Sequence, residues 1–198
     1  MHRSGILGDG TNFEHRLMTI EQAAKIAESI RGIGQKVVAT SGSYDIVHIG
    51  HFRYLETARS FGDFLIVGVD SDEKIRKRKG PDRPIVAEQE RLEMLAHLRH
   101  VDALVLKGVD DPPQHFIKSI RPDILVVSER TKQGKGEIDA LQEFCGRVEV
   151  LPPQAETSTT ARLRMLLVEG VKQYAVNAKE AINGIIDRLV EDMRGKDG

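Results

Sequence analysis

Short apolar runs rich in valine, isoleucine and leucine recur along most of the chain, and segments with helical periodicity separate them. Apolar runs of this length, bounded by polar turns, are typical of strands that are covered on both faces. The predicted strands span residues 37–41, 64–69, 103–106, 124–127 and 148–151.

The segments between these strands carry the three- and four-residue spacing of amphipathic helices. They span residues 50–61, 87–98, 113–120 and 138–145, and a further helix is expected to begin near Ser158. Alternating strands and helices predict an α/β fold, a Rossmann-like doubly wound five-stranded parallel sheet in three layers. The carboxyl ends of such strands share one edge, where folds of this type bind ligands.

Two helical extensions are predicted outside the sheet. Thr19 and Gln22 have capping-box spacing and begin a helix that runs towards Arg31. At the other end, apolar residues at three- and four-residue steps predict an amphipathic helix over residues 176–193, which packs on its own domain or joins two subunits as a homodimer. Its stripe is Ala178, Ile182, Ile185, Ile186, Leu189 and Met193. The predicted organisation is an N-terminal extension with one helix (1–35), the α/β domain (36–170) and a C-terminal amphipathic helix (171–198).

Composition narrows the classes of partner. The 198 residues include 29 lysines and arginines against 30 aspartates and glutamates, a formal net charge of -1, which argues against a globally basic nucleic-acid binder. The single cysteine, Cys145, cannot form an internal disulfide, so we expect a cytoplasmic location. No apolar run approaches the ~18 residues of a membrane span, and residues 1–13 carry no signal-peptide core. We expect neither nucleic acid nor membrane as a partner.

A phosphate-binding pattern follows the first predicted strand. The small residues Ser41, Gly42 and Ser43 allow main-chain N–H groups to approach an anion, and the next helix presents the positive end of its dipole. His48 and His51 lie on one face of that helix's first turn. Gly50 between them has no side chain and leaves room for a ligand.

A second histidine pair and a possible metal site bear on this interpretation of His48 and His51. His97 and His100 repeat the spacing, but they end a helical pattern with no preceding strand or small-residue turn, so we interpret that pair as structural. A zinc site at His48 and His51 is disfavoured, because zinc needs three or four protein ligands and the chain has one cysteine and no H-E-x-x-H motif.

The segment 41–51 resembles a known signature. Ser41-Gly42-Ser43-Tyr44-Asp45 followed by His48-Ile49-Gly50-His51 is similar to the (T/S)-x-G-x-F-D-x-x-H-x-G-H motif of the nucleotidylyltransferase superfamily. Further matches resemble its cytidylyltransferase-like branch, especially the heptose 1-phosphate adenylyltransferases, and the resemblance covers about residues 37–167. These matches are Tyr54-Leu55, Ala58, Gly62-Asp63, residues 65–69, Ser71-Asp72, Lys79-Gly80, Arg83-Pro84, Arg91, Val101-Asp102 and Ser158-Thr159-Thr160.

The resemblance implies roles for individual residues. His48 and His51 would contact the triphosphate and stabilise charge developing at the α-phosphorus, while Ser158, Thr159 and Thr160 would hold the β and γ phosphates. Lys79, which ends the densest basic run, is assigned to the triphosphate or to the acceptor phosphate. Nucleotide contacts are implied for Ser41, Gly42, Ser43, Tyr44, Asp45, Gly50 and Arg91, and acceptor contacts for Arg78 and Arg83. Lys107 follows the third predicted strand and could hold the acceptor phosphate. Mg²⁺ is expected to accompany the nucleotide.

Two departures from the family pattern bear on the substrates. Many members carry G-G-D-Y or G-D-D-W after the fourth strand, where this chain has residues 128–136 of unrelated sequence, so the acceptor pocket is not predicted. Glycerol-phosphate cytidylyltransferases carry an arginine shortly before S-T-T, whereas residues 152–155 here contain none, which favours adenylyl over cytidylyl transfer.

The predicted function is transfer of a nucleoside monophosphate from a nucleoside triphosphate to a phosphorylated small molecule, such as heptose 1-phosphate, with release of pyrophosphate. Alternatives are a glycerol-phosphate or phospho-amino-alcohol cytidylyltransferase, a flavin mononucleotide adenylyltransferase, and a non-catalytic nucleotide-binding regulator. Class I aminoacyl-tRNA synthetases share the His-Ile-Gly-His string, but this chain shows no K-M-S-K-S segment and no broad basic face for tRNA.

Overall fold

The computed structural model describes residues 13–112, 114–129, 140–155, 167, 171, 173–180 and 182–184. The chain divides into two compact units, Met1–Glu156 and Thr157–Gly198, and each is described by itself. Within the described residues, no helix combines the length and the apolar character needed to cross a membrane.

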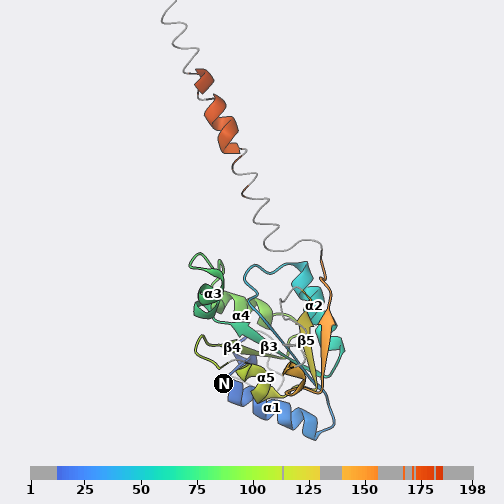
Figure 1. The fold of residues 1–198 in the computed structure, drawn as a ribbon. Helices are drawn as coiled ribbons and strands as arrows, with labels where there is room; N and C mark the ends of the chain where they lie inside the picture. The colour runs from blue at the N-terminus through green and yellow to red at the C-terminus, as the bar shows by residue number, and fades with distance from the viewer. Residues whose placement is uncertain are drawn as a thin grey trace, which may run out of the picture. The chain divides into compact units, whose positions relative to one another are not determined.

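A parallel six-stranded sheet forms the centre of the first unit (Figure 1). Its strands lie in the order β1-β4-β3-β2-β5-β6, and every pair of neighbours is parallel. They are β1 (Leu17–Met18), β2 (Val37–Gly42), β3 (Phe64–Asp70), β4 (Ala103–Lys107), β5 (Ile124–Ser128) and β6 (Arg147–Leu151). The prediction of five strands was wrong by one, because the two-residue strand β1 pairs with the edge of β4 and is too short to show an apolar run.

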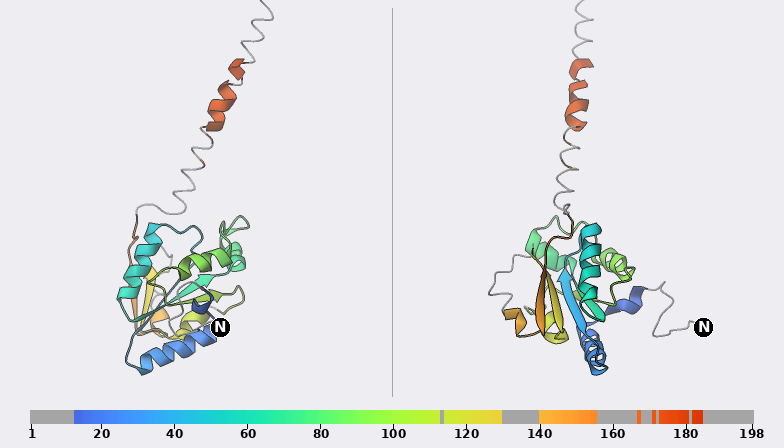
Figure 2. Two further views of the ribbon diagram at one scale, coloured as in Figure 1. Left: turned by 180° about the vertical axis from the view of Figure 1, so that it is seen from behind. Right: turned by 90° about the vertical axis from the view of Figure 1, so that its right-hand side faces the viewer.

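Helices connect consecutive strands, and the views in Figures 1 and 2 show them beside the sheet. They are α1 (Ile20–Gly32), α2 (Ile49–Ser60), α3 (Asp72–Lys79), α4 (Glu88–Ala96) and α5 (His115–Ile120), preceded by the 3₁₀ helix η1 (Phe13–Arg16). The chain runs outward from β2 through β3 to β4 and then crosses back to β5 on the other side of β2. The order of the strands therefore reverses at β2, which is where doubly wound sheets bind ligands.

Alternate strand residues pack into two separate apolar clusters. Leu65 and Val67 of β3 join Leu55 of α2 and Leu92 of α4 in one cluster. Ile66 of the same strand joins the other cluster, to which α1 and α5 contribute. Because successive side chains of a strand point to opposite faces, both faces of the sheet are covered, which explains why its strands are apolar throughout.

Helix α1 is part of this core. Its residues Ala23 and Ala27 are fully buried in the cluster that also contains Ile120 of α5, and Figure 1 shows α1 and α5 side by side. Just before it, the Arg16 guanidinium donates at 2.8 Å to the main-chain carbonyls of Ala96, Leu98 and Val101, which end and follow α4. Arg16, rather than His97 or His100, binds the carbonyls at this helix end.

The basic run of the sequence lies on a helix that the apolar pattern did not predict. Helix α3 begins at the N-cap Ser71, whose Oγ accepts the Lys74 N–H, and Ile75 is its one buried residue. A helix with one apolar contact carries almost no periodic signal, so capping rather than amphipathicity was the available indication.

The described residues of the second unit, among them 173–180 and 182–184, are helical. Val176 and Ile182 on this helix are about half exposed, at 50% and 57%. The predicted late helix start at Ser158, Thr159 and Thr160 lies outside the described residues, as do most of segment 128–136 and the stripe beyond residue 184.

Replacement of the α1 N-cap tests the contribution of this helix to stability. Thr19 Oγ accepts the Gln22 N–H at 3.2 Å and the Gln22 side chain accepts the Thr19 N–H at 2.9 Å, which forms the predicted capping box. We expect Thr19→Ala to lower the free energy of unfolding by about 1 kcal/mol in urea titrations. Ser29→Ala is the control, since that hydroxyl binds only the Lys25 carbonyl on the exposed side of α1; an equal loss in both variants would contradict the capping role.

Candidate active site

The two histidines of the signature accept main-chain N–H groups at the start of α2. His48 is the N-cap, and its Nδ1 accepts the Gly50 N–H at 3.1 Å. His51 Nδ1 in turn accepts the His48 N–H at 3.2 Å. This is a capping box in which imidazoles replace the usual hydroxyl and carboxamide, and it brings the two ring centroids to 4.2 Å.

This hydrogen bonding determines where the rings carry their protons. A neutral imidazole whose Nδ1 accepts an N–H bears its own hydrogen on Nε2. For His51 the neutral form is favoured, because burial, together with the neighbouring His48 and Lys79, lowers its pKa to about 4. At neutral pH His51 therefore offers an Nε2–H donor, and His48 offers the same donor whenever its ring is neutral.

Gly50 is required for this arrangement. A Cβ at residue 50 would lie 2.8 Å from Cε1 and 2.9 Å from Nδ1 of His48, and 2.9 Å from the Cβ of Ala155. The space that the sequence analysis reserved for a ligand is thus occupied by the His48 ring. The glycine permits the ring to fold back onto the helix N-terminus.

The turn after β2 is held from beneath by buried side chains. Tyr44 is 5% exposed and belongs to the core, and its ring lies against Gly42, where a Cβ would be 3.1 Å from the Tyr44 Cε2. Burial raises the pKa of Tyr44 well above its usual value. Tyr44 has a positive φ of 50°, which sharpens the turn. The structure therefore gives Tyr44 a supporting position, and its contact with a nucleotide stays a prediction.

Asp45 is also buried and orders a second loop. Its Oδ1 accepts the main-chain N–H groups of Ile85 at 2.7 Å and Val86 at 3.0 Å, and its Oδ2 pairs with the Arg83 guanidinium. This carboxylate therefore brings the segment around Arg83 against the phosphate-binding turn. Asp45 and Arg83 were predicted to bind nucleotide and acceptor respectively, and the structure shows that they bind each other.

Arg91 of α4 joins three segments of the site. The side chain is fully buried, and it donates to the Val86 carbonyl at 3.0 Å, to Asp72 Oδ1 at 2.8 Å and to the Ser43 carbonyl. A buried guanidinium with partners on three loops fixes their relative positions. The predicted contact of Arg91 with a nucleotide stays a prediction, and the observed contacts are all with protein groups.

The remaining predicted cations meet at the carboxyl ends of β3 and β4. Arg78 donates to Ser43 Oγ at 2.6 Å and to Asp70 Oδ2 at 2.9 Å, and Lys107 Nζ lies 3.0 Å from Asp70 Oδ1. Asp70 was missed by the sequence analysis. The signal that could have found it is strand register, because Asp70 and Lys107 are partners on adjacent parallel strands.

Lys79 ends α3, and it is the one predicted cation whose charge is a cause of the lowered pKa of His51. Partial burial lowers the pKa of Lys79 itself, and the positive charges of Arg78 and Arg83 act in the same direction. The structure thus brings Lys79 into the electrostatic neighbourhood of His51. Ser41, which follows the buried part of β2, is exposed at the same edge.

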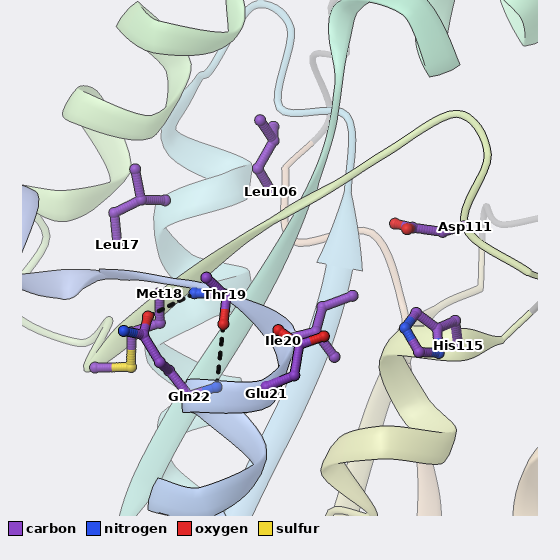
Figure 3. A pocket seen from close by; sticks show the side chains of 9 residues that line it. All are labelled: Leu17, Met18, Thr19, Ile20, Glu21, Gln22, Leu106, Asp111 and His115. Atoms are coloured by element: carbon purple, nitrogen blue, oxygen red, sulfur yellow. Dashed lines mark hydrogen bonds between the residues drawn. The ribbon is translucent and has the colours of Figure 1, made fainter.

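Two open pockets lie at this edge of the sheet beside β4. One, of about 450 Å³, is lined by Thr19, Glu21, Leu106, Asp111 and His115 with four neighbours and contains the capping box of α1 (Figure 3). The other, of about 480 Å³, is lined by the start of α3 and residues 108–111. Neither is lined by His48 or His51, so neither is assigned to the triphosphate.

The fold is that of an α/β Rossmann-like protein, and the turn that carries the signature follows β2, where the strand order reverses. Residues 39–174 match the family model described as cytidylyltransferase-like. The chain therefore belongs to the cytidylyltransferase-like family, and it is a nucleotidyltransferase enzyme, as the sequence analysis predicted.

The chain is also similar in sequence to bifunctional HldE proteins. The chain is 37% identical over 164 residues to the bifunctional protein HldE of Syntrophotalea carbinolica, which covers 77% of this chain and 33% of that protein. It is 49% identical over 114 residues to HldE of Campylobacter curvus, covering 58% and 24%. The chain thus spans a third or less of the length of these relatives.

Solved structures show the same fold. A lipopolysaccharide core biosynthesis protein from Thermoplasma volcanium superimposes with a TM-score of 0.52 and 28% identity, covering 63% of this chain and all of that one. A pantoate-beta-alanine ligase from Francisella tularensis, complexed with an ATP derivative and beta-alanine, gives 0.53 at 19% identity, covering 72% and 68%, and supports the fold alone.

The low pKa of His51 predicts that acidification destabilises the fold. A histidine with a folded-state pKa near 4 and an ordinary unfolded value near 6.5 makes the unfolded chain bind the extra proton between those values, so stability falls as the pH is lowered through that window. We expect an NMR titration to place the His51 midpoint near 4. The fall in the free energy of unfolding from pH 7 to pH 4.5 should be smaller in His51→Asn, which keeps an acceptor for the His48 N–H; an unchanged pH dependence would contradict the assignment.

Adding a methyl group at residue 50 should displace the His48 ring while both histidines are retained. In Gly50→Ala the new Cβ displaces the His48 ring and breaks its bond to the residue 50 N–H. We expect nucleotidyl transfer to fall by about 10²-fold, the size of effect known for a lost preorganised donor. Gly32→Ala at the end of α1 is the matched control, because nothing lies within 4 Å of its Cβ position, and it should leave the rate unchanged.

Proposed function

We propose that the chain transfers the adenylyl group of ATP to the phosphate of a phosphorylated sugar, with heptose 1-phosphate as the first candidate. The observation that carries the proposal is the pair of imidazoles at the start of α2, each accepting a main-chain N–H at Nδ1. This arrangement leaves the Nε2–H of each neutral ring available as a donor beside a helix N-terminus, where a phosphate is favoured by the helix dipole.

The reaction needs positioning and charge stabilisation rather than a covalent enzyme intermediate. An oxygen of the acceptor phosphate attacks the α-phosphorus and forms a new phosphorus–oxygen bond. The bond from the α-phosphorus to the oxygen that bridges to the β-phosphorus breaks, and its electron pair leaves with pyrophosphate. No proton transfer is required, because the acceptor oxygen is already anionic.

The residues divide these tasks by chemistry. His48 and His51 donate hydrogen bonds to the phosphate oxygens that gain charge, and Lys79 supplies a positive charge to the triphosphate. Ser158, Thr159 and Thr160 hold the departing phosphates in this proposal. Arg78, Arg83 and Lys107 lie with the acceptor, and Asp45 and Arg91 keep the loops in place.

Mg²⁺ enters as part of the nucleotide substrate. Asp45, Asp70 and Asp72 are each paired with an arginine or lysine, and the described residues contain no group of three or more metal ligands. Phosphate oxygens and water would therefore supply the ligands of the ion, as is usual for Mg²⁺ at nucleotides.

Support for the acceptor and the location comes from the resemblance and the relatives. The motifs are closest to those of the heptose 1-phosphate adenylyltransferases, and residues 152–155 lack the arginine of the glycerol-phosphate enzymes. We further propose that the protein works in the cytoplasm and that the amphipathic C-terminal helix, with Val176 and Ile182 half exposed, forms a homodimer.

A substrate matrix tests the proposal. ATP, CTP, GTP and UTP are each combined with heptose 1-phosphate, glycerol 3-phosphate, phosphoethanolamine and flavin mononucleotide in the presence of Mg²⁺, and released pyrophosphate is measured. We expect turnover with ATP and the sugar phosphate. Turnover with another pair would overturn the substrate assignment, and tight nucleotide binding with no pyrophosphate from any pair would identify a regulator.

Substitution of either signature histidine should abolish most of the activity while the fold remains. We expect His48→Ala and His51→Ala each to lower kcat by ~10²-fold or more, with unchanged circular dichroism, because each removes a donor to the phosphate. His97→Ala and His100→Ala are the controls: His97 is exposed and His100 lies 3.3 Å from Glu56 on the helix surface. A loss of activity that only followed unfolding would refute the catalytic role.

A further inference from the structure

Asp70 is a buried carboxylate that the proposed reaction does not yet use. It is the last residue of β3 and is 1% exposed. Its Oδ1 lies 3.0 Å from Lys107 Nζ and its Oδ2 lies 2.9 Å from Arg78 Nη2. Because an unpaired buried charge is strongly disfavoured, the two cations compensate the buried carboxylate, and the carboxylate in turn restrains them.

The two cations reach Asp70 from different elements and with different exposure. The Lys107 side chain is 15% exposed, and that of Arg78 is 54% exposed. Lys107 crosses the bare backbone of Gly68, where a Cβ would lie 3.0 Å from the Lys107 Cδ and 3.2 Å from the Phe116 ring. The absence of a side chain at Gly68 thus leaves room for the Lys107 side chain to reach Asp70.

The Asp70 carboxylate also orients the Arg78 side chain. The Nη2 that binds Asp70 also donates to Ser43 Oγ at 2.6 Å, so Arg78 lies against the phosphate-binding turn after β2. Without Asp70, an arginine that is half exposed on a surface helix would sample many rotamers. Asp70 therefore holds one cation from β4 and one from α3 at the same edge of the sheet.

The balance of charge leaves this cluster able to bind an anion. One carboxylate between two cations has a net charge of about +1, which suits a phosphate group better than a neutral ligand. Burial lowers the pKa of Lys107, and Asp70 opposes that shift and favours the charged lysine. The carboxylate thus maintains both the position and the charge of the lysine.

We propose that Asp70 is a positioning residue that preorganises Arg78 and Lys107 as the seat of the acceptor's phosphate group. The inference rests on the proposed function, since it assigns the second substrate of that reaction to this cluster. Preorganised cations lower the cost of binding a phosphate because their side chains need not be ordered when it arrives. Asp70 should therefore govern the affinity for the acceptor and have little influence on the nucleotide.

Asp70→Asn removes the charge and keeps the shape. Varying the acceptor and ATP separately, we expect the KM for the acceptor to rise by about 10-fold or more while the KM for ATP stays within about 2-fold. The alkaline limb of kcat/KM for the acceptor should move to lower pH, because Lys107 loses its neighbouring negative charge and deprotonates more easily. Asp70→Glu, which retains the charge, should recover part of the acceptor affinity.

Asp102→Asn is the matched control, since it makes the same change in an aspartate beside the opposite end of β3. The Asp102 Oδ2 accepts the Leu65 N–H at 2.7 Å and pairs with Arg59 Nε at 2.7 Å. We expect it to lower stability and leave both KM values unchanged. An Asp70→Asn variant that behaved in this way, or that raised both KM values equally, would overturn the inference.

Inorganic phosphate separates this inference from the proposed function. Its binding to the wild type, Asp70→Asn and Lys107→Met is measured by calorimetry. Where the substrate matrix yields turnover, the two KM values decide the role of Asp70, and an unchanged acceptor KM leaves the function standing without it. Where no pair turns over, phosphate binding that weakens about 10-fold in both variants supports the seat, and binding that is absent or unaffected overturns it.

Discussion

The reciprocal capping of His48 and His51 is the interaction on which the site depends. Each Nδ1 satisfies a main-chain N–H of the first turn of α2, which that helix would otherwise leave without a partner in the chain. The same two bonds hold both rings at the helix start and determine the neutral tautomer. Helix capping and the orientation of the donors are therefore one structural feature, and any substitution that disturbs one disturbs the other.

Two buried aspartates, Asp45 and Asp70, hold the arginines and the lysine of the site in position. Asp45 binds Arg83 and the main chain of Ile85 and Val86, while Asp70 binds Arg78 and Lys107. Each carboxylate lies on one segment and its cation on another. Ion pairs with buried carboxylates therefore fix the relative positions of these segments at the edge of the sheet.

Much of the fold could be predicted from the sequence, because the buried parallel strands form continuous apolar runs. Each of the five predicted strands is present within about a residue of its expected bounds. Strand β1 and helix α3 were missed for a common physical reason. Leu17–Met18 is too short for a run, and α3 buries only Ile75, so neither leaves a periodic apolar signal.

The site was predictable where it is local in sequence and unpredictable where it depends on register. The placement of His48 and His51 on one face of the first turn follows from their three-residue spacing, whereas their capping bonds were not predicted. The pairing of Asp70 with Lys107 joins residues that are far apart in the sequence and become neighbours only when β3 and β4 align. Arg91 was assigned to the nucleotide by resemblance, and its full burial depends on segments that are distant in the sequence.

Lys79, the exposed lysine at the end of α3, differs from the other cations of the site. Among the described residues Arg78, Arg83, Arg91 and Lys107 pair with carboxylates, and Lys79 has no such partner there. Burial is the largest cause of the low pKa of His51, and the charges of His48 and Lys79 act in the same direction. Because a carboxylate already pairs with each of the other four cations, a phosphate at Lys79 would compete with no ion pair of the described residues.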